Sequence, residues 1–211
     1  MLKEKRVLIA GGCGLIGRSI TRAFKNAGSK VTTLDIQGDP DIFAHINDLH
    51  LIIFDNFDIF VNATYPFGEG THFSSFLKAS ENCAESMAKQ QGGVIINLSS
   101  IYGVVGSKPD IYEGTTVKPT PVWYSAAKGA IISMTRALAC KYGRFGVRVN
   151  CVSPGGVYDG QDDLFVSMYC ERVPLGRMAT PEDVAGAVVY LAQADYVTGV
   201  NLLIDGGLTA Q

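Results

Sequence analysis

Short apolar runs alternate with amphipathic stretches along this chain, and this alternation restricts its possible folds more than any other feature. The runs expected to form strands are 5–10, 30–36, 57–64, 93–100, 147–156 and 200–207, and the stretches with helical spacing are 15–28, 71–90, 122–143 and 180–193. Such alternation predicts a parallel sheet with helices on both faces. We therefore expect an α/β fold, a doubly wound, Rossmann-like parallel sheet, with residues 1–211 forming a single domain.

Three segments show no clear periodicity of apolar residues. Residues 37–56 fit a weak strand near 42–46 and one short helical segment, 101–121 form a long loop rich in proline and glycine, and 157–180 are irregular or weakly helical. In a doubly wound sheet, ligands bind beyond the carboxyl ends of the strands. The two later segments follow strands, so we expect them to lie near a ligand site.

The first strand leads directly into a glycine-rich turn, AGGCGLIG, at residues 10–17. The glycines satisfy both G-x-G-x-x-G and G-x-x-G-x-x-G, and they stand between a strand and a helix. Without side chains, the backbone can approach a pyrophosphate that faces the N–H groups of the helix. The alternative is a tight turn that requires glycine. The residues predicted to bind the dinucleotide here are Gly11, Gly12, Gly14, Leu15, Ile16 and Gly17.

Asp35 ends the second predicted strand. A carboxylate at this position can accept hydrogen bonds from both hydroxyls of an adenosine ribose, and it repels a 2′-phosphate. The prediction is therefore NAD as the cofactor in preference to NADP. The alternative is an ordinary solvated acid at a strand end.

The stretch VWYSAAKGA, residues 122–130, places Tyr124 and Lys128 on one face of a predicted helix with only small side chains between them. A free phenol has a pKa near ~10 and is a weak base at neutral pH. An ammonium nearby lowers that pKa, and small neighbours leave room for ligands. The alternative is a surface Tyr–Lys pair on an ordinary amphipathic helix.

Seven segments, GGCGLIG, VNAT, INLSS, YSAAK, NCVSPGG, PEDVA and LLIDGG, together resemble the short-chain dehydrogenase/reductase family, in the same order and over the full chain. The resemblance implies that Tyr124 is the general acid/base and that Lys128 lowers its pKa and holds the nicotinamide ribose. It also implies that Ser100 hydrogen-bonds the substrate oxygen. The remaining residues that it places at the cofactor are Asn62, Ala63, Pro154, Gly155 and Val157.

Within that family, the stretch from Ser100 to the SPGG segment is similar to a bacterial branch linked to flagellin and surface-sugar biosynthesis. The 101–121 loop separates Ser100 from Tyr124 by more residues than is usual. Its Tyr102, Tyr112 and Glu113 are candidates for shaping a substrate pocket, and packing within the loop is the alternative for each of them.

The chain departs from the family pattern in several places. His72 occupies the position of the asparagine that usually relays protons with the lysine, so it is a candidate catalytic residue or a structural histidine. Thr64 and Tyr65 replace the glycine of the family's N-A-G segment. The usual threonine after the P-G turn is absent, and the segment between Asp35 and Asn62 is short, which predicts a trimmed adenine side.

Composition excludes several classes of function. The formal net charge of −2 gives no reason to expect nucleic-acid binding. The five cysteines occur singly, which indicates reduced thiols in a cytoplasmic protein, and no stretch is long and apolar enough to span a membrane. The histidines lack metal-ligand spacing with the cysteines, and no G-x-S-x-G elbow surrounds Ser100.

The leading hypothesis is an NAD(H)-dependent oxidoreductase that interconverts an alcohol and a carbonyl on a small polar or sugar-like substrate. A nucleotide-sugar epimerase or dehydratase is a second interpretation, but such enzymes need a larger substrate domain. A third is a catalytically weak NAD-binding regulatory protein. Family members commonly form oligomers through two long helices, so we expect a homodimer or homotetramer through 71–90 and 122–143.

Overall fold

The computed structural model describes residues 2–45, 48, 55–65 and 71–211, with the side chains of 71 and 72 excepted. The strands are β1 (Arg6–Ala10), β2 (Lys30–Asp35), β3 (Ile42–Phe43), β4 (Ile59–Asn62), β5 (Gly93–Leu98), β6 (Val147–Pro154) and β7 (Asn201–Ile204). The helices are α1 (Leu15–Asn26), α2 (Thr71–Lys89), α3 (Val122–Tyr142), α4 (Asp163–Cys170) and α5 (Pro181–Gln193), with short 3₁₀ turns η2 (Ile101–Gly103), η3 (Pro109–Tyr112), η4 (Gly143–Phe145) and η5 (Leu208–Ala210).

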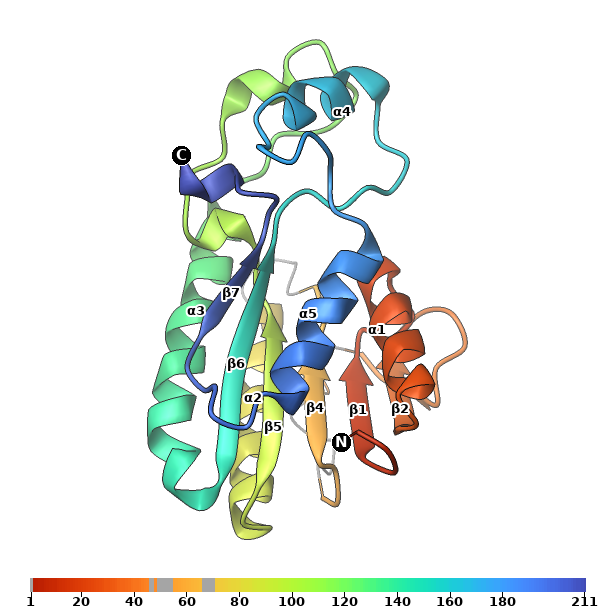
Figure 1. The fold of residues 1–211 in the computed structure, drawn as a ribbon, viewed down its shortest axis with the longest axis vertical. Helices are drawn as coiled ribbons and strands as arrows, with labels where there is room; N and C mark the ends of the chain where they lie inside the picture. The colour runs from red at the N-terminus through yellow and green to blue at the C-terminus, as the bar shows by residue number, and fades with distance from the viewer. Residues whose placement is uncertain (1, 46–47, 49–54, 66–70) are drawn as a thin grey trace.

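The described strands form one sheet in the order β3-β2-β1-β4-β5-β6-β7, and every pair is parallel (Figure 1). The chain winds outward from β1 to β3 and then returns to place β4 on the other side of β1. This change of direction opens a crevice beyond the carboxyl ends of β1 and β4, where doubly wound sheets bind ligands. The predicted doubly wound parallel sheet is confirmed.

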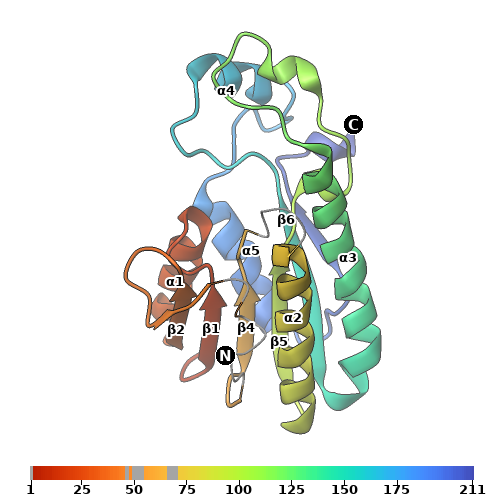
Figure 2. The ribbon, with the colours of Figure 1, turned by 180° about the vertical axis from the view of Figure 1, so that it is seen from behind.

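Helices cover both faces of the sheet because successive strand residues point to opposite sides. Val7 and Ile9 of β1 pack with α1 and α5 in one core cluster. Leu8 and Ala10 of the same strand pack with α2 and α3 in the other cluster. Figures 1 and 2 show the two helix layers in front of and behind the sheet.

A chain of buried hydroxyl and amide groups joins the strands to the helices behind them. Thr64 Oγ1 donates to Asn62 Oδ1 over 2.8 Å, and Asn62 Nδ2 donates to Ser80 Oγ over 3.2 Å. Ser80 Oγ donates to Asn97 Oδ1, and Asn97 Nδ2 donates to Thr135 Oγ1. These bonds fix α2 and α3 against the ends of β4 and β5, and they satisfy polar groups that water does not reach.

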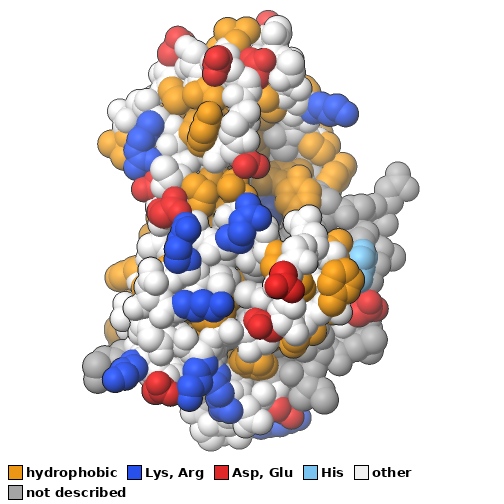
Figure 3. Space-filling view, turned by 90° about the vertical axis from the view of Figure 1, so that its right-hand side faces the viewer, with side chains coloured by type: hydrophobic (Ala, Val, Ile, Leu, Met, Phe, Trp, Pro, Cys, Tyr) orange, Lys and Arg blue, Asp and Glu red, His pale blue; other side chains and the backbone are white. Residues whose placement is uncertain are grey.

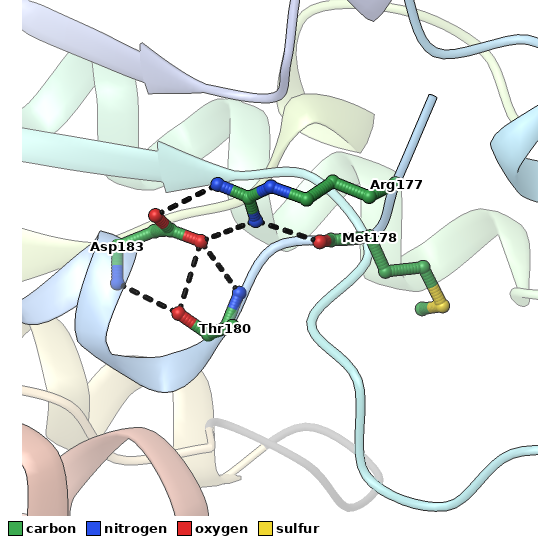
Figure 4. Close-up of polar contacts among 4 residues, drawn as sticks. All are labelled: Arg177, Met178, Thr180 and Asp183. Atoms are coloured by element: carbon green, nitrogen blue, oxygen red, sulfur yellow. Dashed lines mark hydrogen bonds and ion pairs between the residues drawn. The ribbon is translucent and has the colours of Figure 1, made fainter. Parts of the chain in front are cut away.

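The N-terminus of α5 is held by a capping box. Thr180 Oγ1 accepts from the Asp183 N–H, while the Asp183 carboxylate accepts from the Thr180 N–H. Arg177 adds two bonds to the same carboxylate and one to the Met178 carbonyl (Figure 4). The Arg177 guanidinium is the main cause of the lowered pKa of Asp183. This network makes Thr180 the N-cap of α5 and fixes the entry of the chain into this helix.

Residues 104–121 and α4 form a cap beyond the carboxyl ends of the strands, at the top of Figures 1 and 2. Asp110 and Arg172 join the two parts of the cap by paired hydrogen bonds of 3.1 and 2.6 Å. The rings of Tyr112, Phe165 and Tyr169 stack in sequence, with centroid distances of 5.6 and 5.9 Å. Figure 3 shows the hollow between this cap and the body of the molecule from the side.

Most of the expected elements are present within about two residues of the predicted bounds. Gly28 follows α1 with φ of +82°, as expected for the glycine that ends a helix. The weak strand near 42–46 is present as β3, Ile42–Phe43. One short helical segment was also expected somewhere within 37–56, and residues 46–47 and 49–54 of that stretch lie outside the described residues. The irregular stretch after β6 contains α4, which Asp162 caps through the N–H groups of Leu164 and Phe165. No described helix is both long enough and apolar enough to cross a membrane.

Candidate active site

The glycine-rich turn brings the backbone of β1 and α1 close to β4. Gly11 has φ of +79°, and a Cβ at this position would lie 2.6 Å from the Ala63 carbonyl oxygen. A Cβ on Gly17 would overlap the carbonyl oxygen of Gly11. No side chain caps the N-terminus of α1 at Gly14, and its first turn contains no acid. The turn therefore presents uncapped helix N–H groups, the arrangement that binds a phosphate.

A cavity of about 210 Å³ lies next to this turn. Gly11, Gly14, Asp35 and Ala63 line it, together with Tyr65 and other residues. Asp35 is 8% exposed, and its carboxylate accepts hydrogen bonds from the N–H groups of Cys13, Ile36 and Gln37. The carboxylate thus fixes the glycine turn while it also borders the cavity. A carboxylate oxygen has more than one lone pair, so it can accept further bonds from a ligand.

Several residues predicted to bind the cofactor do not line this cavity within the described structure. A Cβ on Gly12 would meet the Thr33 side chain at 2.8 Å, so Gly12 allows β2 to pack closely. Ile16 packs against the core between the sheet and α5, and Asn62 is fully buried in the polar chain. Two further residues of the glycine-rich turn, Leu15 and Gly17, do not line it either. Gly12, Ile16 and Asn62 thus contribute to packing around the turn and not to the cavity lining.

A second cavity, of about 380 Å³, lies beneath the cap. Ser100 and Tyr124 both line it, and the Ser100 hydroxyl is close enough to influence the pKa of the Tyr124 phenol. Ser100 comes directly after the turn that leaves β5, and Tyr124 lies in the first turn of α3. The long 101–121 loop therefore folds away and returns, as expected. The two hydroxyl groups predicted to face a substrate oxygen are brought together.

The turn η2 and helix α3 pack closely here because their contact residues are small. A Cβ on Gly103 would lie 2.7 Å from the Lys128 carbonyl carbon and 2.9 Å from the Gly129 nitrogen. Ser99 Oγ donates to the Lys128 carbonyl oxygen over 2.7 Å. The small residues of the YSAAKGA segment thus let the helix approach the end of β5, and this packing positions Tyr124 against Ser100.

The pKa of Tyr124 is raised from its usual value. Burial of the phenol is the largest cause of the rise, the neighbouring Ser100 hydroxyl opposes it, and the charge of Tyr112 adds to it. Lys128 Nζ lies 5.7 Å from the centre of the Tyr124 ring and donates to the Leu98 carbonyl over 3.0 Å. The ammonium is thus engaged by the backbone, and desolvation of the phenol dominates.

Lys128 is 5% exposed, and burial lowers the pKa of its ammonium to about 8. It lines neither ligand cavity. Because burial lowers this pKa, the charged form of Lys128 destabilises the folded protein. The destabilisation is complete at pH values below the pKa of the folded protein. It disappears as the pH rises from that pKa to the higher pKa of the lysine in the unfolded chain.

A denaturation experiment tests this burial. From about pH 7.5 to about pH 9.5, we expect the free energy of unfolding to rise by about 2 kcal/mol more in the wild type than in Lys128→Met. Urea unfolding followed by circular dichroism measures the difference, and Lys141→Met, which removes an exposed lysine of the same helix, is the control. Equal pH dependence in the wild type and Lys128→Met would show that the ammonium is hydrated.

The P-G-G turn after β6 forms the opposite wall of the second cavity. Gly155, Gly156 and Val157 line it, whereas Pro154 belongs to β6 and does not. The Tyr169 hydroxyl accepts a hydrogen bond from the Gly156 N–H, and a Cβ on Gly156 would meet the Tyr169 ring at 2.8 Å. Tyr169 thereby holds this turn in place, a role that no sequence pattern indicated.

Tyr102 and Tyr112 of the long loop both line the second cavity, whereas Glu113 is exposed and does not. The two hydroxyls lie 3.3 Å apart, and Tyr112 is also 2.9 Å from Thr120 Oγ1. These tyrosines therefore border the cavity and also hold the loop together. The side chain of His72, the candidate proton relay, lies outside the described residues.

Tyr65 is the described residue that lines both cavities. Its ring centroid is 6.3 Å from that of Tyr124, and Tyr102 lies on another side of Tyr124 at 6.4 Å, edge to face. Sequence comparison with the family pattern marked Tyr65 only as a replacement for glycine. Its position connects the cavity at the glycine turn with the one that contains Ser100 and Tyr124.

The described residues contain no group of three or more His, Cys, Asp or Glu side chains that could hold a metal ion. Most of the polar side chains that line the second cavity carry hydroxyl groups. A phenol and a serine hydroxyl in the same cavity can together hold a substrate oxygen and exchange a proton with it.

Comparison with known proteins finds relatives that span most of this chain. Residues 70–209 match a family model described as "Enoyl-(Acyl carrier protein) reductase". The post-translational flagellin modification protein A of Campylobacter coli is 28% identical, over 98% of this chain and 99% of that protein.

Two solved structures share the fold over nearly the whole chain. A short-chain dehydrogenase from Leptospira borgpetersenii with bound NAD+ is 31% identical, with a TM-score of 0.81 and coverage of 98% of this chain and 93% of its own. A gluconate 5-dehydrogenase from Beutenbergia cavernae, described as NAD(P) dependent and holding NADP, is 25% identical, with a TM-score of 0.78 and coverage of 100% and 98%. With the family model covering well over half of its residues, this chain is an NAD(P)-dependent oxidoreductase that belongs to the short-chain dehydrogenase/reductase family.

Proposed function

We propose that this protein uses NAD(H) to interconvert a secondary alcohol and a ketone on a small polar or sugar-like substrate. The observation that carries the proposal is that Ser100 and Tyr124 line one cavity together, and that Tyr65 joins this cavity to the cavity at the glycine turn. The hydroxyl-rich lining of the larger cavity supports a polar substrate, because buried hydroxyl groups need hydrogen-bonding partners.

The residues present fit a dinucleotide. The uncapped N-terminus of α1 and the bare backbone of Gly11 and Gly14 suit a pyrophosphate, and Asp35 suits a ribose. Gly155 and Val157 would border the nicotinamide, and a bound nicotinamide supplies the hydride acceptor or donor. The segment between Asp35 and Asn62 is short in the sequence, so the adenine side would be trimmed.

The chain's own residues carry the proton. In the oxidation direction, Ser100 Oγ holds the substrate oxygen and Tyr124 Oη accepts the hydroxyl proton as the carbon loses its hydride. In the reduction direction, Tyr124 Oη returns that proton to the carbonyl oxygen. The raised pKa of Tyr124 keeps the phenol protonated at neutral pH, which suits it as the acid in reduction. Lys128 fixes the helix carrying Tyr124 through its bond to the Leu98 carbonyl.

Cofactor preference is the first test. We expect the wild type to bind NAD+ about 100-fold tighter than NADP+, because Asp35 would face the 2′-phosphate at close range. In Asp35→Asn, which keeps an acceptor oxygen but removes the charge, the ratio should fall below about tenfold. Calorimetric titration measures both affinities. Asp39→Asn is the control, because Asp39 is a nearby exposed acid that does not line the 210 Å³ cavity.

Turnover is the second measurement of the same test. Formation of NADH is followed with a panel of secondary alcohols, polyols and sugars at saturating NAD+. Tight NAD+ binding with no turnover on any member would favour the catalytically weak, regulatory interpretation. Preference for NADP+ in the wild type would contradict the role given to Asp35.

We also propose that the protein assembles as a homodimer or homotetramer through α2 and α3. Three exposed residues of α3, Ala126, Ser133 and Ala137, are small and permit close approach of a second helix. Lys141 of α3 and Glu81 of α2 form an ion pair of 3.0 Å that keeps the two helices in register.

A further inference from the structure

The larger cavity contains a charge that the proposed reaction does not use. Lys118, on the loop before α3, lines this cavity with Ser100 and Tyr124. We propose that the substrate carries an oxyanion, either a carboxylate or a phosphate, which Lys118 binds while the alcohol carbon is held at Ser100 and Tyr124. This inference rests on the proposed function, because it names the substrate class of the same site.

The charge balance of the cavity supports an anion. Lys118 is the one lining residue, among those described, whose side chain is charged at neutral pH. The rest of the lining is aromatic, hydroxyl-bearing, amide-bearing or aliphatic, and it includes neither Asp nor Glu. An ammonium at the edge of a neutral cavity attracts anions and repels cations. A neutral sugar would leave that charge without a partner in the cavity.

No described carboxylate neutralises Lys118. The described ion pairs of this chain use other lysines and arginines. Within the cap, the Asp110 carboxylate forms an ion pair with Arg172 at 2.6 Å. Asp162, which follows the lining residue Gln161, accepts hydrogen bonds from Leu164, Phe165 and Thr116. Asp110 and Asp162 are therefore committed to other partners.

The backbone on both sides of Lys118 is restrained. Pro119 follows it, which disfavours the helical conformation at Lys118 and keeps this residue extended. Val117, on the other side, packs against the cluster of Ile111, Phe165 and Tyr169. Thr120 is bonded to the Tyr112 hydroxyl at 2.9 Å. Lys118 thus extends from a fixed point on the cavity wall, and only its side chain has to adjust to a ligand.

The geometry gives two anchors for one substrate. Ser100 and Tyr124 hold the oxygen that reacts, and Lys118 holds an oxyanion elsewhere on the molecule. Lysine binds oxyanions as a point charge with three donors, so carboxylate and phosphate are both acceptable. The hydroxyls of Tyr102 and Thr120 lie on the same loop side of the cavity and can donate to hydroxyl groups between the two anchors. A polyhydroxylated acid or sugar phosphate satisfies all of these groups.

Matched probes test the inference. In the first pair, D-gluconate has a carboxylate where D-glucitol has a hydroxymethyl group. In the second pair, D-glucose 6-phosphate has a phosphate that D-glucose lacks. Each probe is titrated calorimetrically into the full-length protein saturated with NAD+, and turnover is measured in parallel. The variants are Lys118→Met, Lys118→Arg and Lys108→Met. Lys108 is an exposed lysine of the same loop that does not line the cavity, so Lys108→Met is the matched control.

We expect the charged member of at least one pair to bind about tenfold tighter than its neutral partner. Lys118→Met should reduce that preference to about twofold or less, while Lys118→Arg and Lys108→Met should keep it. For a probe that is turned over, Lys118→Met should raise KM with kcat within about twofold, because the lysine binds substrate and transition state alike. The pair that shows the preference identifies the oxyanion as carboxylate or phosphate.

Three outcomes would overturn the inference: equal affinity within both pairs, a charge preference that survives Lys118→Met, or no binding of any probe. These outcomes are distinguishable from failure of the proposed function. Turnover of neutral probes without a charge preference rejects the anion site and supports the proposed oxidoreductase function. Binding of charged probes through Lys118 without hydride transfer supports the anion site and contradicts the proposed function.

Discussion

Replacing Tyr124 with phenylalanine should lower kcat about 1,000-fold and leave the dissociation constant for NAD+ within about threefold. The substitution removes one hydroxyl and leaves the aromatic ring in its contacts with Tyr65 and Tyr102. Without the phenol, the substrate oxygen loses the group proposed to exchange its proton, although Ser100 can still hold it. Steady-state NADH formation and calorimetric titration measure the two effects separately.

The same helix provides the control. Tyr142 belongs to α3, and its hydroxyl donates to Glu85 at 3.2 Å on the side away from the cavity. Tyr142→Phe removes an equivalent hydroxyl, so its kcat should stay within about twofold of the wild type. If Tyr124→Phe retained more than a tenth of the wild-type rate, Tyr124 would not be the acid/base. The assignment would then have to move to another hydroxyl of the cavity.

The direction of the pH profile follows from the raised pKa of Tyr124. A phenol whose pKa lies above its usual value is protonated over the neutral range, so alcohol oxidation, which needs the phenolate, should accelerate as the pH rises. Carbonyl reduction, which needs the protonated phenol, should lose rate over the same rise. Tyr124→Phe should flatten both profiles at its lower rate.

Gly17→Ala should lower the free energy of unfolding by about 3 kcal/mol and weaken NAD+ binding by about 100-fold or more. The added methyl group would overlap the carbonyl oxygen of Gly11, and the nearest other atoms belong to the backbone as well. Backbone cannot move aside as a flexible side chain would. The turn would have to separate from α1, which removes both a close packing contact and the phosphate-facing geometry.

Gly186→Ala is the control for that substitution. Gly186 lies inside α5, is exposed, and has no atom within 4 Å of the position of an added Cβ. Alanine there should stabilise the protein by about 0.5–1 kcal/mol, because glycine is the poorer helix former. Urea denaturation and NAD+ titration apply to both variants. Unchanged stability and affinity in Gly17→Ala would mean that the turn is more open than the structure shows.

The sequence predicted the sheet and the position of its ligand crevice because both depend on local patterns. Apolar runs such as 93–98 have the length of a buried strand, and the glycine turn requires a specific backbone that only a few residues can supply. The pairing of Ser100 with Tyr124 was predictable only from the family resemblance. The loop between them has no periodicity from which to infer that it returns to its starting point.

Other features of the site depend on contacts between distant residues, which local pattern does not encode. The bond between Tyr169 and the Gly156 N–H joins a helix of the cap to the turn after β6. The Asp110–Arg172 pair joins residues 62 positions apart. The raised pKa of Tyr124 could not be inferred from the sequence, which shows the spacing of Tyr124 and Lys128 but not the depth at which both are buried.

The chain of hydroxyl and amide groups from Thr64 through Asn62, Ser80 and Asn97 to Thr135 has a consequence for acid tolerance. None of these groups is an acid or base in ordinary solution, so their bonds do not change as protons are added. The cap, by contrast, relies on Asp110, whose pKa is lowered by Arg172 and whose stabilising contribution is lost once the carboxylate becomes protonated. On acidification, the cap should therefore loosen before the ends of β4 and β5, which the hydroxyl and amide groups hold.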